Sequence, residues 1–132
     1  MSYFLDTNTC IYFLKNKSQA ILNRFSSIDA DEIKIPSVVV AELYYGALKS
    51  AKKNENIVKL SGFIALYDVV SFDEKSAEIY GEIRRKLESI GNIIGGNDLL
   101  IAATVLANDG ILVTNNTKEF NRVENLIVED WL

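Results

Sequence analysis

The chain has 132 residues, of which 48% are hydrophobic and 24% charged, a balance typical of a folded domain and unlike that of a disordered chain. This length leaves no room for two independent cores, so we expect a single domain over residues 1–132. One cysteine and no histidine exclude an internal disulfide, histidine-ligated zinc, a Ser-His-Asp triad and a Cys-His nucleophile. The net charge of −4 argues against a general nucleic-acid coat, although it permits a nuclease whose metal site consists of carboxylates.

The N-terminal sequence does not have the pattern of a secretory signal. The first residues, MSYFLDTNT, lack a basic flank and reach an acid at Asp6. No segment approaches the roughly 20 apolar residues that a helix needs to cross a bilayer. We therefore expect a cytoplasmic protein.

Short apolar runs that predict strands alternate along the chain with longer segments that predict helices. Strands are expected at 3–5, 32–36, 67–72 and 111–114, with a fifth candidate at 126–128. Helices are expected over 11–14, 18–28, 37–48, 54–66, 73–90 and 98–108, the third of them capped by Ser37. This alternation predicts an α/β fold in which a parallel sheet of four or five strands has helices on both faces.

Four acidic side chains occupy positions that suggest a site, in chain order Asp6, Glu42, Asp98 and Glu119. Asp6 ends the first strand, Glu42 interrupts an apolar helix, and Asp98 begins an almost wholly apolar one. Glu119 follows the fourth predicted strand and the sequence Thr-Asn-Asn. Because sites in parallel sheets lie beyond the carboxyl ends of the strands, we expect these acids to converge on one cleft.

Carboxylates that lie close together repel one another, and a bound cation would relieve this repulsion. Two negative charges ~4 Å apart repel by about 4 kcal/mol at an effective dielectric of 20. Several acids together therefore either acquire raised pKa values or bind a cation, and Mg²⁺ or Mn²⁺ prefers oxygen ligands. Phosphodiester hydrolysis is the natural reaction class, because it depends on charge neutralisation and needs no histidine.

Each acid also has an ordinary structural explanation. Asp6 would cap a helix that begins in Asp-Thr-Asn, and Asp98 or the adjacent Asn97 would cap the helix 98–108. Glu42 would lie on the wet side of its helix, and Glu119 would be a surface residue. The hypothesis of an active site therefore depends on the four residues together.

Several motifs carry a family resemblance, namely FLDTNTCIYFLKNK, PSVVVAELYYGALKS, GGNDLLIAA, VTNNTKEFNRV and the ending VEDWL. With them the chain resembles a PIN domain, and more narrowly the VapC-type toxin ribonucleases of bacterial toxin–antitoxin modules. The motifs span the whole chain in the order and spacing of that family. The resemblance implies a three-layer PIN-like domain and an endoribonuclease that depends on Mg²⁺ or Mn²⁺.

The resemblance also assigns roles to residues. It implies that Asp6, Glu42 and Asp98 are the metal ligands. The fourth acidic position departs from many relatives, because Asn116 stands where an aspartate often follows Thr-Asn, and Glu119 is the candidate to supply that charge directly or through water.

Two further residues match polar positions that support the site in this family. Asn8 would orient Asp6 through its amide, and Thr114 would provide a hydroxyl behind the ligands.

A substrate and partners follow from the same resemblance. Relatives with these motifs include toxins that cut initiator transfer RNA in the anticodon loop, so tRNA is the leading candidate substrate. A small antitoxin whose tail lies across the cleft is the expected inhibitor, and the toxin is expected to form a homodimer. The densest basic clusters are candidates for RNA contact or, alternatively, solvated helix faces: Lys49, Lys52 and Lys53, and Arg84 with Arg85.

Two other functions deserve comparison. Haloacid-dehalogenase-like phosphatases begin with a strand ending in Asp-x-Asp-x-Thr, but this chain has Asn8 in place of the second aspartate and lacks a convincing lysine motif. A catalytically silent PIN module that acts through partner or RNA binding is the non-enzymatic alternative, because Asn116 leaves the fourth acidic position unfilled.

Overall fold

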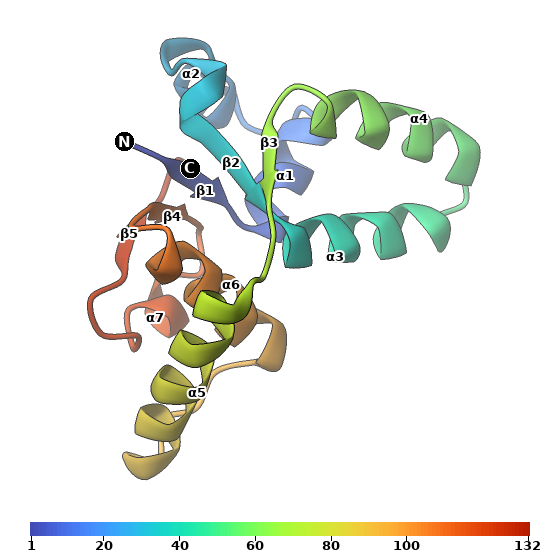
Figure 1. Cartoon of the computed structure of the whole chain (residues 1–132). Helices are drawn as coiled ribbons and strands as arrows, with labels where there is room; N and C mark the ends of the chain where they lie inside the picture. The colour runs from blue at the N-terminus through green and yellow to red at the C-terminus, as the bar shows by residue number, and fades with distance from the viewer.

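Five short parallel strands form the centre of the protein, as a computed structural model of residues 1–132 shows (Figure 1). Their order across the sheet is β3-β2-β1-β4-β5, and every neighbouring pair is parallel. The strands are β1 (Tyr3–Leu5), β2 (Ile33–Pro36), β3 (Asp68–Val70), β4 (Ile111–Val113) and β5 (Ile127–Glu129). The structure thus confirms the predicted α/β class and the fifth strand.

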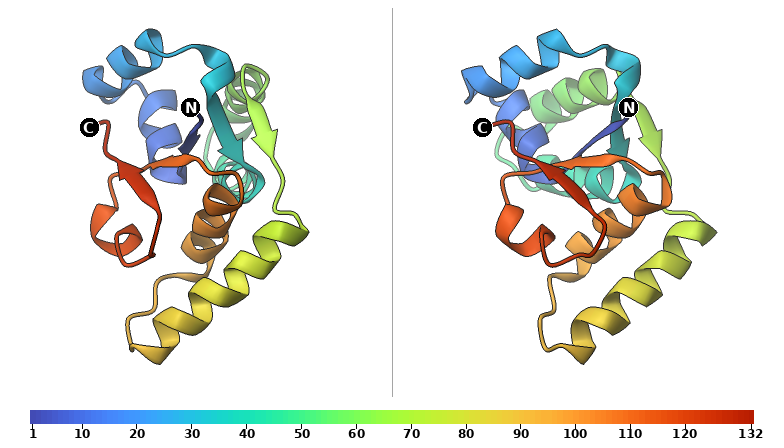
Figure 2. Two further views of the ribbon diagram at one scale, coloured as in Figure 1. Left: turned by 60° about the vertical axis from the view of Figure 1, so that its left-hand side comes forward. Right: turned by 90° about the vertical axis from the view of Figure 1, so that its left-hand side faces the viewer.

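Helices cover both faces of this sheet (Figures 1 and 2). Connections between parallel strands are right-handed, which places the helices that precede β3 on one face and those that follow it on the other. Figure 1 shows α3 and α4 on one side of the sheet and α5 and α6 on the other, and in Figure 2 α5 lies on the outer side of α6. The helices are α1 (Thr7–Leu14), α2 (Gln19–Ser27), α3 (Ser37–Leu48), α4 (Lys53–Ile64), α5 (Glu74–Ser89), α6 (Gly96–Ala107) and α7 (Thr117–Phe120), with a 3₁₀ turn over Ala30–Glu32.

A cluster of 22 buried apolar residues joins the sheet to its helices. The central strands β1 and β4 contribute fully buried side chains, among them Phe4, Leu5 and Leu112. The most buried helix is α6, whose apolar sequence fits a position against β2 and β4. No helix has both the length and the apolar character needed to span a membrane.

Some predicted boundaries were wrong. Helix α1 begins at Thr7 rather than Ile11, because Asp6 caps it directly after β1. Ser37 is not a cap but the first residue of α3, and its hydroxyl accepts a hydrogen bond from the backbone N–H of Phe72 at 3.2 Å. Helix α6 begins at Gly96, so neither Asn97 nor Asp98 is its N-cap. The four-residue helix α7 had not been predicted.

The strand order reverses at the centre of the sheet. The chain moves outward from β1 to β2 and β3, and then returns to the other side of β1 with β4. Ligand sites in open α/β sheets lie beyond the carboxyl ends of the strands at such a reversal. The residues that follow β1 and β4 at this point are Asp6 and Thr114.

Candidate active site

Asp6 is a buried carboxylate, 5% exposed, at the carboxyl end of β1. Its Oδ1 accepts a hydrogen bond from the backbone N–H of Thr9 at 2.9 Å, and its Oδ2 accepts one from the hydroxyl of Thr114. Burial raises the pKa of Asp6, the hydrogen bonds from Thr114 and Thr9 oppose this rise, and the nearby charge of Glu42 adds to it. Asp6 is therefore both the cap of α1 and a member of the acidic site.

Glu42 approaches this edge from α3, where it is half-buried. The hydroxyl of Thr7 donates to its Oε1 at 2.7 Å, and the amide of Asn97 donates to its Oε2 at 3.3 Å. These two donors come from the first turns of α1 and α6, so they fix the carboxylate between the two helices. Sequence reasoning missed Thr7 and considered Asn97 only as a helix cap.

Asp98 and Glu119 face each other at the same place. Asp98 belongs to the first turn of α6, and Glu119 to the short helix α7. Burial, followed by the charge of Glu119, a hydrogen bond shared with that carboxyl group, and the charges of Glu42 and Asp6, raises the pKa of Asp98 to about 6. The four predicted acids therefore lie near one another at this edge of the sheet, although no three of them are grouped closely enough to hold a metal ion as they stand.

Thr114 and Asn116 connect β4 to α7. The Thr114 hydroxyl, besides donating to Asp6, accepts the backbone N–H of Asn116 at 2.9 Å. The side-chain amide of Asn116 donates to Glu119 Oε2 at 3.1 Å. Asn116 thus stands beside the acid proposed to replace it, and Thr114 makes the supporting contact that the sequence predicted.

Asn8 does not orient Asp6 as predicted. It is exposed in the first turn of α1, and the hydrogen bonds to Asp6 come instead from Thr9 and Thr114. The backbone geometry of an N-cap gives this role to the N–H three residues after the cap, which is Thr9.

The donor set has the chemistry that a hard divalent cation needs. Each carboxylate oxygen of Asp6 and Glu42 accepts a single protein hydrogen bond and so keeps further acceptor capacity. No lysine or arginine forms an ion pair with Asp6, Glu42, Asp98 or Glu119. No group of three or more acidic or cysteine side chains is already arranged as a metal cage. The residues thus fit a divalent cation in type and charge, whereas their present spacing does not form a complete ligand set.

The basic residues proposed to contact RNA lie on three different helices, α3, α4 and α5. Lys49 lies at the end of α3 and lines a groove that reaches Glu42, whereas Lys52 and Lys53 are exposed at the start of α4. Arg84 donates to Glu88 at 3.3 Å and to the Tyr80 hydroxyl at 2.7 Å. The remaining candidate, Arg85, is exposed on α5.

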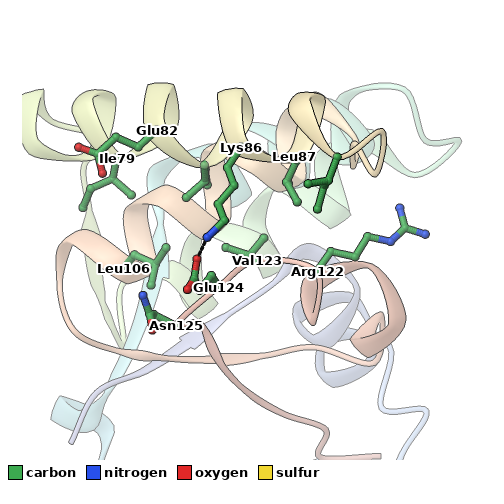
Figure 3. Close-up of a pocket in the computed structure, with 11 residues that line it drawn as sticks. Ile79, Glu82, Lys86, Leu87, Leu106, Arg122, Val123, Glu124 and Asn125 are labelled. Carbon is green, nitrogen blue, oxygen red and sulfur yellow. Dashed lines mark ion pairs between the residues drawn. The ribbon is translucent and has the colours of Figure 1, made fainter.

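Another pocket, of about 320 Å³, lies between α5, α6 and the segment 122–125 (Figure 3). Its walls include the apolar side chains of Ile79, Leu106 and Val123, and Lys86 forms an ion pair with Glu124 across it. None of the four converging acids lines this pocket, so it is separate from the acidic site.

Known proteins share both the sequence and this architecture. The family model of the PIN domain matches residues 3–126. Ribonuclease VapC2 of Rickettsia felis is 45% identical over 132 residues, covering 99% of this chain and 98% of that protein. The tRNA(fMet)-specific endonuclease VapC of Shigella flexneri is 39% identical over 131 residues, covering 99% and 98%. The crystal structure of VapBC2 from Rickettsia felis, bound to a promoter DNA fragment, matches with a TM-score of 0.94 and 44% identity over 100% of both chains.

The protein has an α/β fold with carboxylates beyond the carboxyl ends of the central strands, and the PIN-domain model matches nearly its whole length. The chain therefore belongs to the PIN-domain family. Within that family, relatives that match along the full length place it among the VapC ribonucleases. The resemblance drawn from the sequence motifs is confirmed.

Proposed function

We propose that this protein is an endoribonuclease toxin that hydrolyses RNA phosphodiester bonds and is neutralised by a cognate antitoxin. The observation that carries the proposal is the position of Asp6, Glu42, Asp98 and Glu119 at one edge of the sheet. Hydrogen bonds from Thr114 to Asp6, from Asn97 to Glu42 and from Asn116 to Glu119 connect the segments that carry them. Relatives named as ribonucleases, at 39–45% identity over nearly the whole chain, support it.

Hydrogen-bond donors around the site orient its carboxylates. Burial raises the pKa of Asp6, whereas hydrogen bonds from Thr114 and Thr9 favour its ionised form and fix its direction. Thr7 and Asn97 fix the direction of the Glu42 carboxylate. Such fixed oxygen ligands lose little conformational freedom when they bind a cation or a substrate.

We propose Mg²⁺ or Mn²⁺ as the cofactor, held by Asp6, Glu42 and Asp98, with Glu119 completing the negative site beside Asn116. A bound ion of this kind neutralises phosphate charge and lowers the pKa of water. The acids of this chain bring the charge that retains the ion, and Asp98 must release its proton to take part, because ligands bind in their deprotonated form.

For the substrate we propose transfer RNA, with the anticodon loop of the initiator species as the first candidate. The support is the Shigella flexneri relative, which is named a tRNA(fMet)-specific endonuclease. For the partners we propose a small antitoxin and a second toxin copy. The Rickettsia felis structure, a VapBC2 assembly, supports the antitoxin.

The test of this function is cleavage of purified initiator tRNA with Mg²⁺ or Mn²⁺, comparing the wild type with Asp6→Asn and Asp98→Asn. We expect each substitution to lower the rate at least about a hundredfold, because metal-mediated charge stabilisation is worth several kcal/mol. Asp31→Asn, which removes an exposed acid from the turn before β2, is the matched control and is expected to cut normally.

Mapping the ends of the fragments identifies the cleaved bond. Cleavage that persists in both site variants would overturn the assignment of the site. A chain that binds its antitoxin but cuts no RNA with either ion would instead support the silent module that Asn116 suggested.

A further inference from the structure

A groove between α1, α3 and α4 begins at the candidate active site. It has a volume of about 320 Å³, and Glu42 is the only acidic residue that lines it. Its apolar walls include Ile11, Leu14, Leu43 and Leu60. Three lysines line it as well, one from each helix or its end: Lys15, Lys49 and Lys59. We call it the lysine groove.

The three lysines of the groove are not paired with acids. None of them forms an ion pair, although Arg24, Lys34, Arg84 and Lys86 all do so elsewhere. The ammonium of Lys49 lies 4.8 Å from the centre of the Tyr45 ring, a contact that leaves its positive charge in place. All three residues are exposed to solvent. An anion in the groove would therefore gain attraction without having to displace an existing ion pair.

Helix dipoles explain only part of this arrangement. Lys15 and Lys49 follow the last residues of α1 and α3, where a cation is favourable in any helix. Lys59 lies inside α4, which runs from Lys53 to Ile64, so no helix end accounts for it. The neighbouring Lys52 and Lys53 do not line the groove. The shared feature of the three lysines is therefore the groove itself.

We propose that the lysine groove binds the sugar–phosphate backbone of the RNA strand that leads away from the scissile bond on the Glu42 side. The inference depends on the proposed ribonuclease function and specifies which surface positions its substrate. A polyanion fits the unpaired lysines, and the groove is continuous with the carboxylate site through Glu42. Ribose and base faces would contact the apolar walls. Lys15 and Lys59 are thereby new RNA-positioning residues. Of the lysines proposed from the sequence, Lys49 belongs to the groove, whereas Lys52 and Lys53 lie outside it.

The test measures binding without cleavage. A fluorescein-labelled single-stranded oligouridylate is titrated with the full chain in EDTA at several KCl concentrations, and anisotropy gives the affinity. The groove variant is Lys15→Ala/Lys49→Ala/Lys59→Ala. The control, Lys17→Ala/Lys75→Ala/Lys118→Ala, loses the same charge from exposed positions outside the groove.

We expect the slope of log K for RNA association against the logarithm of the KCl concentration to become shallower by about 2 in the groove variant. Each phosphate contact to a single strand contributes roughly 0.7 to this slope, and the variant loses three lysines. The control should keep the slope of the wild type. Equal slopes in the two variants would overturn the proposal. So would a groove variant that keeps its RNA affinity but no longer binds the antitoxin, because the groove would then be a protein-docking surface.

Two further measurements separate this proposal from its alternatives. A purely structural role of the lysines would lower the Tm of the groove variant without changing its salt slope, which would also count against RNA binding. Failure of the ribonuclease function would appear as absence of cleavage by the wild type, whatever the slopes show. If the groove variant cleaves RNA and keeps the wild-type salt slope, the proposal that the groove binds RNA is rejected, while the ribonuclease function stands.

Discussion

At the scale of single residues, Asp6 combines two roles that its sequence context offered as alternatives. It caps α1 through Thr9, and it takes its place among the acids through an orientation that Thr114 fixes. Burial favours the neutral form of Asp6 and raises its pKa, whereas the hydrogen bonds favour the ionised form. The charge available to the site therefore depends on a hydroxyl 108 residues away in the sequence.

Replacing Thr114 by valine tests this dependence. The variant keeps the shape of the side chain but leaves a buried carboxylate without one of its donors, which typically costs about 1.5–3 kcal/mol for a charged group. Urea unfolding at neutral pH measures the loss. Thr104→Val is the control, because that buried hydroxyl donates only to the backbone carbonyl of Leu100 in its own helix. Equal losses in the two variants would contradict the role assigned to Thr114.

Asp98 gives a prediction about pH. Its pKa in the folded protein, raised by burial and then by Glu119, Glu42 and Asp6, is about 6, against an ordinary value of 3.8. The folded state thus binds this proton more tightly than the unfolded chain. The resulting stability is fully present below 3.8 and is lost as the pH rises through about 6.

Asp98→Asn should therefore raise the Tm of the metal-free protein above pH 6, because it removes a charge that the other acids repel. The advantage over the wild type should shrink as the pH falls below that value. Thermal unfolding in EDTA across this range measures both effects. An advantage that is the same at every pH would show that Asp98 does not titrate as described.

At the scale of elements, the sequence predicts what local patterns determine. Apolar runs located all five strands. The acids of the site were found because Asp6 and Glu119 follow strands, Asp98 lies in the first turn of a helix, and Glu42 interrupts an apolar helix. The polar stretch Thr117–Phe120 gave no helical periodicity, since its single turn depends on packing beside β5. The donors to Glu42 were not predicted either, because Thr7 and Asn97 lie 35 and 55 residues from it and meet it only in the folded chain.

Two glycines show how the surrounding elements decide the outcome of one substitution. A Cβ at Gly110, just before β4, would lie 2.4 Å from ring atoms of the buried Phe4 in β1. Gly81 in the middle of α5 has no atom within 4 Å of such a position. Gly110→Ala should therefore destabilise by about 1–3 kcal/mol through overpacking. Gly81→Ala should stabilise by roughly 0.5–1 kcal/mol, since alanine favours the helix interior.

Chemical denaturation of the two glycine variants and the wild type measures the loss of unfolding free energy expected for Gly110→Ala and the gain expected for Gly81→Ala. A neutral Gly110→Ala would mean that β1 and β4 can move apart at this end of the sheet.

At the scale of the whole molecule, charge is separated in a way that the net value of −4 conceals. The acids of the site come from four separate parts of the chain and lie beyond the carboxyl ends of the central strands. The groove lined by the unpaired lysines begins beside one of these acids, Glu42. The fold therefore places self-repelling negative charge next to unpaired positive charge. Folding itself brings the acids together, so the metal-free protein bears the cost of their repulsion.

A divalent ion should consequently stabilise the fold. An ion that binds only the folded state adds about 2.7 kcal/mol at a concentration a hundred times its Kd. We expect Mn²⁺ to raise the Tm of the wild type and of Asp31→Asn alike, because Asp31 is exposed in the turn before β2. Asp98→Asn should start from a higher Tm in EDTA above pH 6 and gain little from Mn²⁺, so the order of wild type and variant reverses as the ion is added. Equal Mn²⁺ shifts in all three proteins would place the bound ion elsewhere, and Asp98 would then be a structural acid in the first turn of α6.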